Sequence, residues 1–282
     1  MNKFVDFLKM IKIEHSIFAL PFAFTGAIIA ANGIPEFNKI LWIIVAMVGA
    51  RTGAMGLNRV IDAEIDKRNP RTANREIPAG KIKKNEAIFY IIISFVVYEF
   101  ATLMLNKLCF ILSPIPLVIF ILYSYTKRFT ALCHIVLGVA LGLAPIGAWV
   151  AIRGDINTGI VLMGLAVLFW VAGFDIIYAL QDIDFDRKEN LHSIPRYFGV
   201  RNSLVLSRIF HMLAFFIFLY LYKYFNFGLI YLFGILICGA FMFYQHRLIK
   251  SDDLSRVNIA FFNLNAYISL TVFMFTLLDI IF

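Results

Sequence analysis

The sequence predicts an all-α protein that crosses a membrane nine times. Of its 282 residues, 61% are hydrophobic, well above the ~45–50% that is typical of soluble domains. Apolar runs of roughly 20 residues, the length that spans a bilayer, recur along the whole chain. Lys and Arg are concentrated in alternate loops between these runs, as expected for a multi-pass membrane protein.

The apolar runs define the predicted helices in order. They cover 13–32, 40–65, 86–106, 108–124, 134–152, 158–182, 204–223, 226–245 and 257–281. The first run is long and has no A-x-A-like cleavage site, so we interpret it as a span and not as a cleaved signal. No linker or low-complexity tract interrupts the chain, and residues 1–282 are therefore predicted to form a single domain.

The distribution of basic residues predicts the topology. If the N-terminus is cytoplasmic, the loops on the opposite side hold only Lys39, Lys107, Arg153 and Lys223. The cytoplasmic segments hold most of the other Lys and Arg residues, as the positive-inside rule requires. We therefore predict a cytoplasmic N-terminus and an external C-terminus.

Several other features favour structural roles. The net charge of +8 would suit a nucleic-acid partner, but the basic residues lie in short loops and follow the topology. The three cysteines and five histidines have no metal-ligand or redox spacing, so the cysteines are interpreted as small buried hydrophobes. Gly138, Gly142 and Gly147 in the fifth span indicate close packing between helices.

The stretch from residue 58 to 80, NRVIDAEIDKRNPRTANREIPAG, contains the first candidate site. Asn58, Asp62 and Asp66 recur every four residues, so on a helix they lie roughly along one face. Carboxylates in a membrane span are costly and usually face a protein interior. Two of them one turn apart repel each other unless a cation lies between them. Mg²⁺ favours such carboxylates together with phosphate oxygens, which predicts Asp62 and Asp66 as metal ligands.

A second copy of this pattern ends the sixth span. Tyr178, Asp182 and Asp186 repeat the four-residue spacing, and Asp182 follows Asp62 by 120 residues. The second and sixth spans both run towards the cytoplasm, so the two acidic patterns are expected at the same membrane depth. All four aspartates are therefore predicted to share a metal and phosphate cluster. Glu64 and Asp184 lie about 200° round the helix from these positions and are predicted to face solvent.

Basic residues near both patterns are predicted to bind the substrate. Lys127 and Arg128 either serve topology alone or contact phosphate or carboxylate groups. Arg51 lies about two turns before Asn58, and a buried guanidinium requires an anion. It either pairs with Asp175 or Glu14 or holds a substrate carboxylate. The full set of predicted phosphate-binding residues is Arg71, Arg75, Lys127, Arg128 and Lys188.

Two further residues of the sixth span have open roles. Asp175 lies two turns before Asp182 and near the same face, so it either supports the metal ligands or belongs to the acceptor pocket. Tyr178 either stabilises a cation through its ring or bonds a phosphate oxygen.

These motifs resemble the UbiA superfamily of intramembrane aromatic prenyltransferases, and most of all the 4-hydroxybenzoate polyprenyltransferase group. The resemblance covers nearly the whole chain. It is carried by EHSIFALPFAF, NRVIDAEID, RTANREIPAG, YTKRFT, LGLAPIGAW, YALQDIDFD and SIPRYFG. Two positions depart from the family pattern: Arg59 stands where many members have aspartate, and Asn190 where glycine is frequent.

The resemblance implies nine helices around a central cavity that opens near the cytoplasmic face. It also implies Mg²⁺-dependent transfer of a polyprenyl chain from polyprenyl diphosphate to an aromatic acceptor in quinone biosynthesis. The acceptor is expected to be 4-hydroxybenzoate, on the ubiquinone route, or else 1,4-dihydroxy-6-naphthoate, on the menaquinone route. By position, Asn58, Asp62 and Asp66 match the family's first aspartate motif, and Asp182 and Asp186 match its second. A cation-coupled transporter is the alternative from another class.

Overall fold

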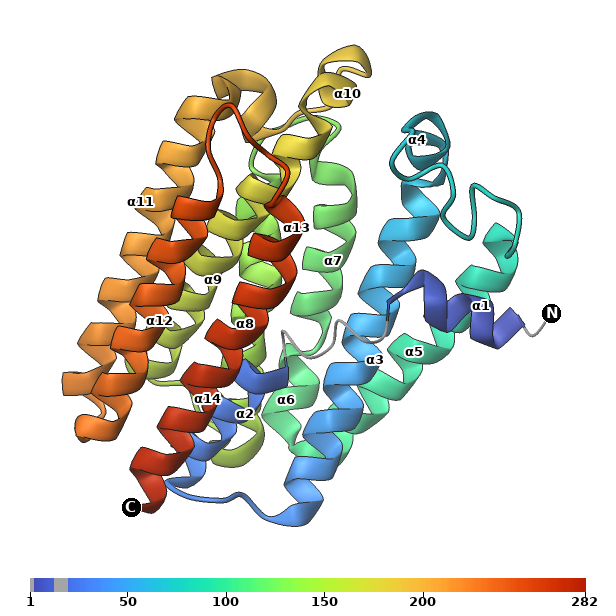
Figure 1. The fold of residues 1–282 in the computed structure, drawn as a ribbon. Helices are drawn as coiled ribbons and strands as arrows, with labels where there is room; N and C mark the ends of the chain where they lie inside the picture. Colours follow the sequence, from blue (N-terminus) through green and yellow to red (C-terminus); the bar gives the residue numbers. More distant parts are fainter. Residues whose placement is uncertain (1–2, 13–19) are drawn as a thin grey trace. The chain divides into compact units, whose positions relative to one another are not determined.

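The computed structural model describes residues 3–12 and 20–282 (Figure 1). Throughout these residues every extended regular element is a helix, and the one β-feature is an isolated bridge between Lys250 and Asp253. The predicted all-α class is thus confirmed. In chain order the elements are α1 (Lys3–Met10), α2 (Leu20–Ala31), α3 (Phe37–Ile61), α4 (Ala63–Arg68), α5 (Lys84–Leu105), α6 (Lys107–Leu112), α7 (Pro114–Thr126), α8 (Cys133–Arg153), α9 (Thr158–Ala179), η2 (Leu180–Asp182), α10 (Ile183–Lys188), α11 (Ile194–Tyr224), α12 (Leu229–Leu248), α13 (Val257–Ile259), the π-helix η3 (Ala260–Leu264) and α14 (Asn265–Ile281).

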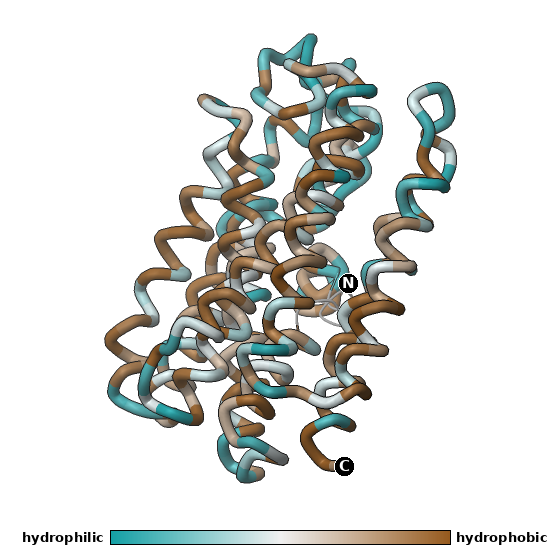
Figure 2. Tube along the Cα trace, turned by 90° about the vertical axis from the view of Figure 1, so that its left-hand side faces the viewer, coloured by the Kyte–Doolittle hydropathy of each residue, from teal (hydrophilic) through white to brown (hydrophobic). Residues whose placement is uncertain are grey.

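Most predicted spans correspond to helices. Eight helical stretches in the described part of the chain are long and apolar enough to cross a membrane. Their traces are largely hydrophobic, and hydrophilic residues gather in the connecting loops (Figure 2). The first predicted span, 13–32, lies partly outside the described residues, where α2 supplies a shorter apolar helix. The number nine therefore stays a prediction.

The chain divides into two compact units, each with its own packing. The first contains α1 and the helices from α3 to α7, with α5 packed along α3 and α1 packed on both. Phe7, Met10 and Ile11 are buried against Ile82 and Ile91. The short amphipathic α1 thereby covers the ends of α3 and α5 that flank the first aspartate motif.

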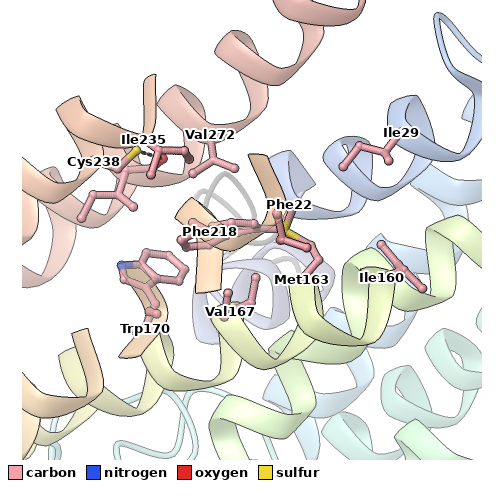
Figure 3. Packing of buried hydrophobic residues seen from close by; sticks show 14 of the residues in the cluster. Phe22, Ile29, Ile160, Met163, Val167, Trp170, Phe218, Ile235, Cys238 and Val272 are labelled. Carbon is pink, nitrogen blue, oxygen red and sulfur yellow. Dashed lines mark hydrogen bonds between the residues drawn. The ribbon is translucent and has the colours of Figure 1, made fainter. Parts of the chain in front are cut away.

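The second unit contains α2 and the helices from α8 to α14, and α9 lies at its centre. α9 packs against α8 and α11, and α14 packs against α12 and α2. Trp170 of α9 contacts Phe22 of α2, which in turn stacks on Phe218 of α11 (Figure 3). All three rings are fully or almost fully buried, so this core holds the helix that leads into the second aspartate motif.

The close packing of α8 against α9 depends on glycine residues. A Cβ at Gly138 would lie 2.5 Å from the carbonyl oxygen of Leu168, and one at Gly142 equally close to that of Gly164. At Gly147 no described atom lies within 4 Å. Close packing is confirmed for the first two glycines and is wrong for Gly147.

Candidate active site

The first aspartate motif spans a break between two helices. α3 ends at Ile61, and Asp62 leaves the helical conformation with φ −88° and ψ 0° before α4 begins. The side chain of Asp62 does not cap α4; one of its oxygens accepts a hydrogen bond from Asn58 Nδ2 at 3.1 Å. Asp62 is 2% exposed. The structure therefore brings Asn58 and Asp62 together as the sequence predicts.

Asp66, the fourth residue of α4, is held by an arginine. Arg75 Nη1 donates to both of its carboxylate oxygens at 2.8 Å. The backbone carbonyl of Asp66 accepts from the hydroxyl of Thr72 at 3.0 Å, which folds the basic loop back onto α4. Because the Asp66 side chain is only 6% exposed, its charge requires a cation nearby, and Arg75 meets that need here.

The second motif has the same local architecture in the second unit. Asp182 ends the short η2 segment and precedes the six-residue α10, in which Asp186 is again the fourth residue. Asp182 does not cap α10 either. Asp186 is buried and accepts a hydrogen bond from Ser193 Oγ at 2.7 Å. Each motif thus has one aspartate at a helix break and a second one, buried within the short helix, that a residue further along the chain binds.

The intervening acidic residues face away from these sites, as predicted. The side chains of Glu64 and Asp184 are 70% and 93% exposed. Glu64 pairs with Lys84 at 2.9 Å, and this hydrogen bond holds the pKa of Glu64 below its usual range.

Tyr178 lies one turn before Asp182 and stacks on an aromatic residue of the π-helix. The centroids of Tyr178 and Phe261 are 4.1 Å apart, and Phe262 touches the same ring edge-on. The wider turn of η3 directs two consecutive phenylalanines towards α9, and π-turns are frequent at functional sites.

Asp175 forms a close pair with a histidine of α8. Its Oδ2 lies 2.7 Å from Nδ1 of His134, which is 2% exposed. The backbone N–H of Ile194 donates to the other ring nitrogen of His134 at 3.4 Å. The predicted site residue Asp175 is therefore joined, through His134, to the segment that follows α10.

The predicted phosphate-binding residues lie in the segments that follow α4 and α7 and at the end of α10. Arg71 and Arg75 occupy the loop between α4 and α5, where Asn69 Oδ1 accepts a bond from the Arg71 backbone. Lys127 and Arg128 lie between α7 and α8, and Lys188 ends α10. Whether these side chains bind a substrate stays a prediction.

Arg51 and Arg59 both hold the C-terminal end of α1. Arg51 donates to the carbonyls of Ile11 and Lys12 at 3.3 and 3.1 Å, and Arg59 Nε donates to that of Met10 at 3.4 Å. The last carbonyls of a helix have no partner within it, and cations are favoured at that end. Two carboxylates are predicted as partners of Arg51. Asp175 pairs with His134, and Glu14 lies outside the described residues.

Arg59→Ala should therefore release α1. A hydrogen bond from a charged donor contributes roughly 1.5–3 kcal/mol, enough to make the docking of an eight-residue helix unstable. We expect hydrogen exchange of the α1 amides to accelerate at least about tenfold, with α5 unchanged. Exchange at the wild-type rate would show that Arg59 does not anchor α1. Lys81→Ala, which changes a residue whose backbone carbonyl binds Lys3, is the control.

Three residues of this site are not predicted from the sequence: His134, Ser193 and Phe261. His134 and Asp175 are 41 residues apart, so no local spacing could reveal the pair. Phe261 is one of 30 phenylalanines. Ser193 carried a usable signal, because a serine two residues before proline is typical of a helix N-cap.

The donor chemistry of the motifs fits a magnesium ion. Mg²⁺ prefers carboxylate and other hard oxygen ligands and takes one or two carboxylates from a protein. Each motif offers two aspartates on one short segment, and one of the buried carboxylates, that of Asp66, already binds a cationic group. No single cluster of three or more His, Cys, Asp and Glu residues that could hold a metal occurs among residues 3–12 and 20–282.

Comparison with known sequences gives consistent matches. A model described as the UbiA prenyltransferase family matches residues 19–267. The 4-hydroxybenzoate octaprenyltransferase of Francisella tularensis subsp. novicida (strain U112) is 28% identical over 257 residues, 91% of this chain and 90% of that protein. The enzyme of the same name from Citrobacter koseri is 28% identical over 281 residues, 97% of this chain and 95% of that one.

Solved structures agree with these matches. The apo structure of a UbiA homologue from Aeropyrum pernix K1 has a TM-score of 0.86 and 33% identity, covering 95% of this chain and 98% of that one. A UbiA homologue from Archaeoglobus fulgidus bound to GPP and Mg²⁺ has a TM-score of 0.67 at 18% identity, covering 95% and 99%. The second likeness shows a shared fold.

Proposed function

The chain belongs to the UbiA prenyltransferase family, and from this premise we propose that it transfers a polyprenyl chain from polyprenyl diphosphate to 4-hydroxybenzoate. It is an integral membrane enzyme with several apolar spans. The observation that carries the proposal is the repeated aspartate motif, with one aspartate at a helix break and a buried one held from downstream. The relatives named 4-hydroxybenzoate octaprenyltransferase cover nine-tenths or more of the chain and support this acceptor.

We propose further that the two units act as one prenyltransferase domain in the bacterial inner membrane. Each unit contributes one motif, and the family match runs through both. Asp62, Asp66, Asp182 and Asp186 are the residues that would hold the metal and the diphosphate. The bacterial relatives support the location.

Two Mg²⁺ ions held by these four aspartates would neutralise the diphosphate and make it a better leaving group. Arg71, Arg75, Lys127, Arg128 and Lys188 would bind the remaining phosphate oxygens. The Mg²⁺-bound relative supports this role. Arg75 pairs with Asp66, so its guanidinium lies beside a carboxylate that would hold the ion.

The aromatic residues of the second unit would protect the reacting carbon. Cleavage of the allylic C–O bond leaves a delocalised carbocation on the prenyl chain, and an aromatic face attracts a cation. Tyr178 lies one helical turn before Asp182, and its ring packs on that of Phe261. The acceptor ring then attacks next to its hydroxyl and loses a proton. Water must be excluded during this step because it would quench the cation.

A transfer assay tests the proposal. Purified protein in lipid is incubated with octaprenyl diphosphate, Mg²⁺ and either 4-hydroxybenzoate or 1,4-dihydroxy-6-naphthoate, and products are identified by mass. We expect prenylated 4-hydroxybenzoate, no naphthoate product, and loss of turnover when EDTA removes the metal. Naphthoate product alone would move the enzyme to the menaquinone route. No product from either acceptor, with the protein folded, would reopen the transporter alternative.

A further inference from the structure

Residues 191–194 complete the connection from α10 and begin α11, and they are fixed at three points of the second unit. The backbone N–H of His192 donates to the carbonyl of Lys127 at 2.7 Å. The backbone carbonyl of His192 accepts a weak hydrogen bond from Cys133 Sγ at 3.7 Å. The N–H of Ile194 donates to His134 Nε2. A connecting segment held in this way can set the position of the side chains that it carries.

Ser193, in the middle of this segment, has its hydroxyl direction fixed. It is the N-cap of α11, where its Oγ accepts the N–H of Arg196 at 3.3 Å. A hydroxyl has a single proton to donate, and here the proton goes to Oδ2 of Asp186 at 2.7 Å. Both side chains are buried. The carboxylate of Asp186 is therefore oriented by a residue that is itself held on both sides.

His134 has a hydrogen-bond partner at each of its two ring nitrogens. Because Nε2 accepts the N–H of Ile194, the proton of the neutral ring lies on Nδ1 and is donated to Asp175. Asp175 thus selects the tautomer that can receive the Ile194 N–H. The result is a continuous chain of hydrogen bonds from Asp175 through His134 to the Ser193–Ile194 turn, and from that turn to Asp186.

We infer that Asp175 and His134 are positioning residues for the second aspartate motif: they lock the Ser193–Ile194 turn, whose serine presents Asp186 to a divalent cation. This inference rests on the proposed function, because it assumes that Asp186 is a metal ligand. In this arrangement Asp175 supports a metal ligand and does not contact the aromatic acceptor. Hydrogen-bond partners of metal ligands typically contribute 10–100-fold to metal affinity.

Paired variants separate positioning from packing. In His134→Gln the side-chain carbonyl can reach the place of Nε2 and keep an acceptor for Ile194. In His134→Asn the amide can replace Nδ1 towards Asp175, but the acceptor for Ile194 is lost. Ser193→Thr keeps the hydroxyl that Ser193→Ala removes, and Asp175→Asn keeps an acceptor oxygen that Asp175→Ala removes.

The readout is Mn²⁺ affinity of the full chain in lipid nanodiscs, measured by electron paramagnetic resonance without substrate. We expect His134→Asn, Ser193→Ala and Asp175→Ala each to weaken Mn²⁺ binding about 10–100-fold. Each matched variant should stay within about threefold of wild type. The control is His211→Asn, a buried histidine of α11 that bonds His246 and the carbonyl of Trp170; it should lower thermal stability without changing Mn²⁺ affinity.

The outcomes distinguish the two proposals. Wild-type Mn²⁺ affinity in the folded His134→Asn and Asp175→Ala variants would overturn the positioning role while leaving the proposed function intact. So would an Asp175→Ala variant that binds Mn²⁺ normally but has a raised KM for 4-hydroxybenzoate, because Asp175 would then contact the acceptor. Folded wild-type protein that binds no Mn²⁺ and transfers no prenyl group would overturn the proposed function, and the positioning role with it.

Discussion

Asp62→Ala and Asp182→Ala should each lower prenyl transfer by about three orders of magnitude while the protein still inserts into the membrane. Metal stabilisation of a leaving diphosphate contributes several kcal/mol to the barrier, and each 1.36 kcal/mol corresponds to a tenfold change in rate. Both aspartates stand at helix breaks without capping the following helix, so their removal should leave the helices in place. Turnover is measured by mass spectrometry of the product at saturating Mg²⁺.

The same short helices supply the controls for this result. Glu64 and Asp184 are carboxylates two residues beyond each of these aspartates, and both are exposed. Glu64→Ala and Asp184→Ala should transfer within about twofold of wild type, since exposed ion pairs contribute little. Near-normal turnover in Asp62→Ala or Asp182→Ala would contradict the metal site. An equal loss in the controls would point to general damage.

Gly138→Val should strongly destabilise the second unit. The new side chain would meet the backbone carbonyl of Leu168, and backbone atoms cannot give way as a flexible side chain can. Overpacking of this kind costs about 2–3 kcal/mol, which corresponds to a fall of roughly 5–10 °C in apparent Tm. The measurement is thermal unfolding in detergent, followed by tryptophan fluorescence.

Gly147→Val on the same helix is the matched control. No described atom lies within 4 Å of a Cβ placed there, so this variant should melt within about 2 °C of wild type. Because α8 carries His134 and α9 carries Asp175, separating the two helices should also reduce transfer. Equal Tm values for the two valine variants would contradict the close packing of α8 on α9 at Gly138.

The conformational preference of asparagine explains why Asn190 can depart from the family pattern. Asn190 stands where related sequences often have glycine, and it adopts φ +57°. Asparagine tolerates this left-handed conformation better than other residues with a side chain. The Arg196 guanidinium also binds its side-chain oxygen at 3.0 Å. The turn after α10 therefore keeps its shape without glycine.

The sequence by itself determined the helical class, most of the spans and the two aspartate motifs, because these depend on local patterns. Apolar runs must be helical in a bilayer, since backbone groups there have no water to bond. Residues four apart on a helix share a face, so the spacing of the aspartates predicts their common orientation from the sequence alone. For the same reason Glu64 and Asp184 could be assigned to solvent.

Tertiary structure alone decided the partners of the charged residues, because those partners are distant in sequence. Arg51 and Arg59 bind carbonyls about forty to fifty residues away. Asp175 pairs with a histidine on another helix. Gly138 and Gly147 look alike in the sequence, yet only the first faces a neighbouring backbone. A hydrogen bond depends on distance in space, and sequence spacing predicts that distance only within one helix.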